Sequence, residues 1–131
     1  MKSYLEAKNQ GEGKPRDIKE RTFRFSVNIV QLCQLMSEKP GVMRTLAGQL
    51  LHAGTSIGAN VEEAQAGQSR ADFVSKYAIA LKEARETMYW LKLIRECDGS
   101  TGISHDALLK EADEIARIIG KIIVNAKNRR V

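Results

Sequence analysis

The sequence predicts an all-α fold, an antiparallel up-down-up-down four-helix bundle, and three observations support this prediction. Apolar residues recur at alternating spacings of three and four through four long segments, which is the period of an amphipathic helix. The connections between these segments are short, and short connections favour antiparallel neighbours. No segment alternates cleanly between apolar and polar residues, so the sequence predicts no strand.

The first helix is expected to begin at Asp17 and to end before Pro40, because proline lacks the backbone N–H that a helix interior requires. Residues 1–16 are polar and contain glycine and proline, which is typical of a flexible basic N-terminal arm. Residues 17–131 then form the bundle. The apolar stripe of this first helix consists of Phe23, Phe25, Val27, Ile29, Val30, Leu32 and Met36.

The second helix is expected over residues 42–66. Its heptad-like seam consists of Met43, Leu46, Leu50, Ala53, Ile57, Asn60 and Ala64. Gly54 and Gly58 share one face of this helix, and each costs about 1 kcal/mol relative to alanine, so we expect a neighbouring backbone to approach closely there. A buried amide must be hydrogen-bonded and can fix the register of a bundle, which is the role we favour for Asn60 over ligand binding.

The third helix is expected to run from a capping box at Ser69 and Asp72 to about Cys97. Its main seam consists of Val74, Tyr77, Leu81, Ala84, Met88 and Leu91. A second row at heptad spacing lies beside it and includes the only tryptophan. A helix that is apolar on more than one stripe must bury the extra stripe, and another copy of the protein is one candidate to cover it. The expected oligomer interface therefore consists of Ile79, Glu83, Glu86, Trp90 and Leu93.

Glu83 stands out within this row, because no basic residue lies three or four positions from it. We expect its partner on another helix or on another subunit. The fourth helix is expected to begin after a cap at Ser104. Its seam consists of Leu108, Ala112, Ile115, Ile119, Ile122 and Ala126.

The sequence gives little support for an enzyme active site or for a metal site. Neither His52 nor His105 has a glutamate three positions before it, which a di-iron bundle site requires. Cys33 and Cys97 lie among apolar helical neighbours, so we interpret both as reduced, buried residues. No G-x-S-x-G elbow is present, and no strand precedes a glycine-rich loop. The sequence thus predicts a protein that is not an enzyme and needs no cofactor or metal.

The sequence also lacks the features of a membrane protein. Its apolar runs, such as residues 77–81, are too short to span a bilayer. Residues 1–16 have no apolar core of the kind that a signal peptide needs. We therefore expect a cytoplasmic protein without a membrane partner.

Positive charge gathers at the two ends of the chain. The net charge is +5 and the isoelectric point is near 9.4, which is a modest attraction for polyanions. Cations in the last turn of a helix also complement the helix dipole, so the C-terminal cluster has a structural explanation as well. If nucleic acid binds, the expected contacts are Arg16, Lys19, Arg21, Arg24, Lys121, Lys127, Arg129 and Arg130.

Several short motifs resemble those of a known family. They are SIGANVEEA at residues 56–64, SRADF at 69–73, ALKEARET at 80–87 and YWL at 89–91. Together they are similar to the four-helix-bundle family of the 23S ribosomal RNA intervening-sequence protein, over about residues 19–125. One departure concerns the glycine that many members have soon after the glutamates, because here it arrives only at Gly67.

This resemblance implies a ring-shaped homo-oligomer, expected as a pentamer, and it brings no catalytic residues. It also implies a link to nucleic acid. Coding sequences of the family lie inside ribosomal RNA genes, and a related accessory protein of diversity-generating retroelements binds nucleic acid and a reverse transcriptase.

Three functions remain open at this point. The first is a homo-oligomeric scaffold that binds RNA or DNA through basic residues. The second is a protein–protein adaptor that holds partner helices, for instance on the Trp90–Leu93 stripe. The third and weakest is an enzyme whose site is built between subunits. The salt dependence of binding distinguishes the first two functions, because phosphate binding weakens steeply with salt and apolar docking does not.

Overall fold

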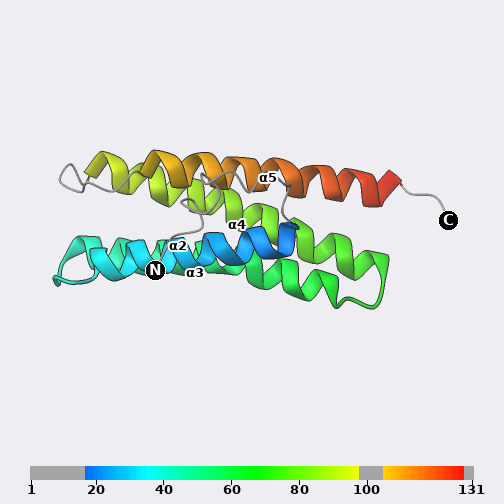
Figure 1. The fold of residues 1–131 in the computed structure, drawn as a ribbon, viewed down its shortest axis with the longest axis horizontal. Helices are drawn as coiled ribbons and strands as arrows, with labels where there is room; N and C mark the ends of the chain where they lie inside the picture. The colour runs from blue at the N-terminus through cyan, green and yellow to red at the C-terminus, as the bar shows by residue number, and fades with distance from the viewer. Residues whose placement is uncertain (1–16, 98–104, 129–131) are drawn as a thin grey trace.

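Four α-helices make up the computed structural model, which describes residues 17–97 and 105–128 (Figure 1). They are α2 (Ile18–Met36), α3 (Val42–Gln65), α4 (Arg70–Cys97) and α5 (His105–Asn128). Successive helices run in opposite directions, and the described residues contain no strand (Figure 1). The predicted fold class is therefore confirmed, whereas the predicted arm at residues 1–16 lies outside the described residues.

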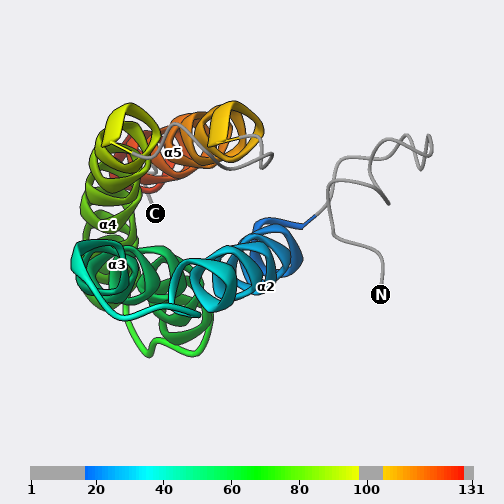
Figure 2. The same ribbon diagram turned by 90° about the vertical axis from the view of Figure 1, so that its left-hand side faces the viewer.

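Each helix packs mainly on its neighbour in the chain. The contacts of α3 with α2, of α3 with α4 and of α4 with α5 are extensive, and the contact between α2 and α5 is much smaller. In section the four helices form an open C with α2 and α5 as its ends (Figure 2). Because α4 lies in the back of this C, its outer side faces away from α2.

The helix ends follow from local chemistry. Gly41 separates α2 from α3 with a φ of 138°, a backbone conformation that residues with a Cβ rarely adopt. The backbone N–H of Asp72 donates a hydrogen bond of 3.1 Å to Ser69 Oγ, which confirms the predicted cap of α4. The predicted cap at Ser104 lies outside the described residues.

The predicted close approach of a neighbouring backbone is present at Gly58, whereas at Gly54 the close neighbour is a side chain. A Cβ atom on Gly54 would lie 2.9 Å from two side-chain carbons of Ile29, and one on Gly58 would lie 3.3 Å from the carbonyl oxygen of Thr22. Both neighbours belong to α2. The absence of a side chain at these positions therefore lets α2 pack directly on the backbone of α3.

The buried stripe of α4 differs from the predicted seam. The buried residues are Tyr77, Ala80, Ala84, Thr87, Leu91 and Ile94. Val74, Leu81 and Met88 were expected in this seam but are only half-buried. The reason is that α4 packs between α3 and α5, so the stripe midway between these two neighbours is the one that is buried, and small alanines suit that position.

Three expectations about burial were wrong. Val30 was assigned to the apolar stripe of α2, but it is 37% exposed. Phe23 was assigned to the core, but 59% of its surface is exposed, because it points outward beside the α2–α3 contact. Cys97 was expected to be buried, yet it is exposed in the last turn of α4. Cys33 is buried as predicted, and this burial raises the pKa of its thiol to about 11.

Candidate interaction surfaces

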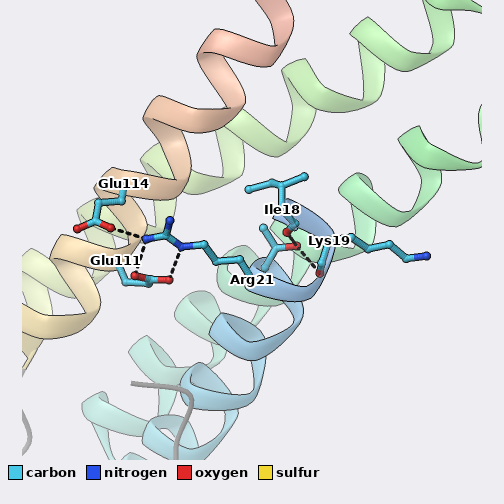
Figure 3. Close-up of polar contacts among 6 residues, drawn as sticks. Ile18, Lys19, Arg21, Glu111 and Glu114 are labelled. Atoms are coloured by element: carbon cyan, nitrogen blue, oxygen red, sulfur yellow. Dashed lines mark hydrogen bonds and ion pairs between the residues drawn. The ribbon is translucent and has the colours of Figure 1, made fainter. Parts of the chain in front are cut away.

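An arginine clamp joins α2 to α5 (Figure 3). The Nε atom of Arg21 donates to Glu111 Oε2 at 2.8 Å, and its Nη2 atom donates to Glu111 Oε1 at 2.9 Å and also to Glu114. The Glu111 side chain is 2% exposed and that of Arg21 is 12% exposed. This bidentate geometry is the strong form of an ion pair. It joins the start of α2 to α5, a helix that α2 otherwise contacts little.

The clamp changes the set of cations available to a phosphate. Arg21 was predicted to contact nucleic acid, but its guanidinium is already bound by two carboxylates. Lys19 lies 3.6 Å from Glu62, and about half of its side chain remains exposed. Arg24, Lys121 and Lys127 are exposed.

The structure brings part of the predicted basic set toward one end of the molecule. The start of α2 and the end of α5 lie toward the same end of the bundle (Figure 1). Lys19 lies in the first turn of α2, and Lys127 lies in the last turn of α5. Arg16, Arg129 and Arg130 lie outside the described residues.

The expected oligomer interface forms one continuous line along α4. We refer to its members as the interface row, which consists of Ile79, Glu83, Glu86, Trp90 and Leu93. Ile79 is 38% exposed, and the other four are half-buried within this single chain. The indole N–H of Trp90 donates to Glu86 Oε2 at 3.3 Å, so part of the polar character of the row is satisfied internally.

Glu83 is the unsatisfied member of the interface row. Its Oε1 atom is buried and has no hydrogen-bond partner within residues 17–97 and 105–128. An unsatisfied buried oxygen costs about 1–3 kcal/mol, so a donor from outside this part of the chain would be stabilising. The expectation that Glu83 finds no partner on its own helix agrees with this geometry.

The core contains a buried amide, that of Asn28, which sequence analysis missed. Asn60 donates to the carbonyl oxygen of Ser56 at 2.8 Å, a bond within its own helix that cannot set the register between helices. Asn28 on α2 is instead only 6% exposed, and neither amide atom has a partner within the described part of the chain. The sequence could have indicated its burial, because Asn28 follows Phe25 by three positions and precedes Leu32 by four, which places it on the apolar face of the helix.

Two carboxylates near the end of α3 are surface ion-pair partners. Glu62 is paired with Lys19, and Glu63 lies 2.8 Å from Lys76. The hydrogen bond to Glu63 raises the pKa of the Lys76 ammonium group. Within the residues that the structure describes, no three His, Cys, Asp or Glu side chains gather closely enough to hold a metal ion. No helix in this part of the chain could cross a membrane.

Comparisons with known proteins agree with the fold and with the motifs. The family model described as 23S rRNA-intervening sequence protein matches residues 14–121. A solved structure from Bacteroides thetaiotaomicron, described as a protein with unknown function from the S23 ribosomal protein family, is 38% identical in sequence. The match covers 82% of this chain and 98% of that chain, with a TM-score of 0.74.

No curated protein is similar enough to this chain to count as a relative. The family match nevertheless covers most of the chain and includes the clamp, the interface row and the two glycines at the α2–α3 contact. The chain therefore belongs to the family of the 23S rRNA-intervening sequence protein.

Proposed function

We propose that this protein is a homo-oligomeric helical scaffold, with a ring of five copies as the expected form, that binds RNA or DNA and catalyses no reaction. The observation that carries the proposal is the interface row of α4. This row combines half-buried apolar side chains with a buried Glu83 oxygen that lacks a donor within the described residues. A second copy that covers the row would bury the apolar surface and supply the missing donor.

Charge supports the nucleic-acid part of the proposal. A ring multiplies the net charge of +5 by the number of its copies, and each cation that reaches a phosphate releases counterions. The exposed cations of the predicted set contribute to this charge: Lys19, Arg24, Lys121 and Lys127. Arg16, Arg129 and Arg130 are still proposed as contacts. Arg21 is no longer proposed, because its guanidinium is bound in the clamp. The family takes its description from ribosomal RNA, which agrees with such a ligand.

Light scattering tests the oligomer directly. We expect the wild-type particle to have five times the protomer mass of 14.6 kDa. Trp90→Glu places a charge in the interface row and is expected to reduce the mass to that of one protomer. Val42→Glu is the matched control, because Val42 is 73% exposed at the start of α3, away from the row, and the mass should not change. A wild-type mass of 14.6 kDa would contradict the oligomer.

Binding to a labelled single-stranded oligonucleotide tests the second part. The affinity should fall steeply between low and moderate salt, because phosphate contacts release counterions. An absence of binding even at low salt would contradict the nucleic-acid part and leave the scaffold intact.

A groove between α2 and α3 favours a second candidate function, a protein–protein adaptor. Two cavities of about 370 and 260 Å³ lie along the outer side of this helix pair. They are lined in part by Phe23, Val30 and Leu51, which are 59%, 37% and 38% exposed. An apolar groove of this kind fits a partner helix. Binding of a protein partner that is insensitive to salt, together with no binding of nucleic acid, would favour the adaptor.

A further inference from the structure

The outer side of α4 carries a second line of residues that sequence analysis did not single out. We refer to it as the basic row, which consists of Lys82, Arg85, Tyr89 and Lys92. Their spacings of three, four and three place them on one face of the helix. All four are exposed, and α4 itself lies in the back of the open C (Figure 2).

The cations of the basic row differ from those that the fold pairs with carboxylates, and in this respect they resemble Arg24, Lys121 and Lys127. Arg21, Lys76 and Arg117 each lie within 3 Å of a carboxylate oxygen. Lys82, Arg85 and Lys92 have no ion pair within residues 17–97 and 105–128. Like charges one turn apart on a helix destabilise it slightly, so an unpaired cluster of this kind is an electrostatic cost to the free protein. A bound polyanion would relieve this repulsion, and the relief would add to the affinity.

Two acidic residues near the basic row offset its charge only in part. Glu86 accepts the hydrogen bond from the indole of Trp90. Glu96 lies at the far end of the row and is 3.6 Å from Arg95. The basic row therefore remains a positive surface with an aromatic side chain in it.

Tyr89 supplies the aromatic part of this surface. Its ring is 58% exposed and meets the ring of Trp90 edge-on, with centroids 5.1 Å apart and an angle of 75° between the planes. This contact orients the Tyr89 ring. A groove of about 500 Å³ lies beside it, lined by Arg85, Met88, Tyr89, Lys92, Leu93 and Glu96. A groove with cations along it and an aromatic ring in it is the usual arrangement for a single strand, whose bases are free to stack.

We propose that the basic row of α4 is the contact surface for single-stranded nucleic acid. Lys82, Arg85 and Lys92 contact successive phosphates, and a base stacks on Tyr89. This inference rests on the proposed function and deepens it, because it moves the principal contact from the ends of the chain to the middle of α4. The interface row lies about a quarter turn around the same helix, and of its members only Leu93 also lines the groove, so a second copy of the protein can cover most of the interface row and leave the basic row open.

The experiment compares two triple variants that remove the same charge. The first is Lys82→Gln with Arg85→Gln and Lys92→Gln, in the basic row. The second, the end triple, is Arg24→Gln with Lys121→Gln and Lys127→Gln, from the contacts predicted near the two ends of the chain. Fluorescence anisotropy with a labelled oligouridine measures the affinity at several salt concentrations. Light scattering and circular dichroism confirm that both variants keep the mass and helix content of the wild type.

We expect the basic-row triple to weaken binding by about tenfold or more and to reduce the salt slope by about 2, since each phosphate contact on a single strand contributes about 0.7. The end triple should change the affinity by less than about threefold. Tyr89→Ala should weaken binding by about 5- to 150-fold, the range that loss of one stacked base gives, and Tyr89→Phe should retain it. A DNA duplex should compete less well than the single strand.

The possible failures are distinguishable. If the wild type binds and the basic-row triple binds equally well, the contact lies elsewhere and only this inference is overturned. A similar loss in both triples would also overturn it, because the charge would then act without a defined site. If the wild type does not bind the oligonucleotide at low salt, the nucleic-acid part of the proposed function fails as well.

Discussion

The α2–α5 contact and the outer side of α4 use cations in opposite ways. At the α2–α5 contact Arg21 is 12% exposed and is held by two carboxylates from another helix. On α4, Lys82, Arg85 and Lys92 face solvent, and none has an ion pair within the described residues. A cation whose charge is compensated inside the fold stabilises the fold, whereas an uncompensated one is available to a ligand. Substitutions in the two regions should therefore separate stability from binding.

The largest effect is expected at the clamp. Arg21→Ala removes the bidentate partner of the buried Glu111 carboxylate, so the free energy of unfolding should fall by about 3–5 kcal/mol. Urea denaturation followed by circular dichroism measures this change. Arg24→Ala, one turn further along α2 and exposed, is the control and should cost less than about 0.5 kcal/mol. Equal losses in the two variants would show that the clamp contributes no special stability.

A second comparison uses two glycines of α3. Gly54→Ala places a Cβ atom 2.9 Å from carbons of Ile29 and should destabilise the protein by about 1–3 kcal/mol. Gly48→Ala meets no atom within 4 Å and should stabilise it by about 0.5–1 kcal/mol, because alanine favours the helix. Thermal or urea unfolding of both variants reports the difference. Stabilisation by Gly54→Ala would show that α2 does not pack as closely on α3 as described.

The two cysteines should differ in reactivity. Burial raises the pKa of the Cys33 thiol from 9.0 to about 11, so Cys33 should resist iodoacetamide at pH 8 while the exposed Cys97 reacts. Mass spectrometry of the alkylated peptides measures this. Because the raised pKa belongs to the folded state, the stability linked to Cys33 is complete below pH 9 and is lost as the pH rises toward about 11. Cys33→Ala should remove this part of the pH dependence, and rapid alkylation of Cys33 at pH 8 would contradict its burial.

The smallest effect on stability is expected in the basic row. Arg85→Gln relieves repulsion with Lys82 one turn away, so it should raise the free energy of unfolding by about 0.2–0.5 kcal/mol at low salt and by less at high salt. Urea titrations at the two salt concentrations test this. A loss of more than about 1 kcal/mol would mean that Arg85 has a structural role within the fold.

Sequence periodicity was sufficient for the architecture. The four helices begin and end close to the predicted residues, because Pro40, Gly41 and the Ser69 cap act locally. The close approach at Gly54 and Gly58 was also predictable, since glycines that share a helix face are costly without such a neighbour.

The remaining features depend on which side of a helix meets which neighbour. Periodicity finds an apolar stripe, but it does not show that Phe23 lies outside the stripe that packs on α3. The clamp joins Arg21 to Glu111, which are 90 positions apart, so no local pattern reveals it. The basic row was missed for a similar reason. Only the fold shows that Lys76 and Arg95 of the same helix have carboxylate partners on α3 and α5.

The central claim is that the outer side of α4 contacts nucleic acid, and a photochemical cross-link tests it most directly. A single strand that contains 4-thiouridine is bound to the wild-type protein and irradiated, and the cross-linked peptides are identified by mass spectrometry. We predict that the cross-links fall on the segment that contains Tyr89, between Arg85 and Lys92. Cross-links confined to the segment around Lys121 and Lys127 would contradict the claim and return the contact to the end of α5.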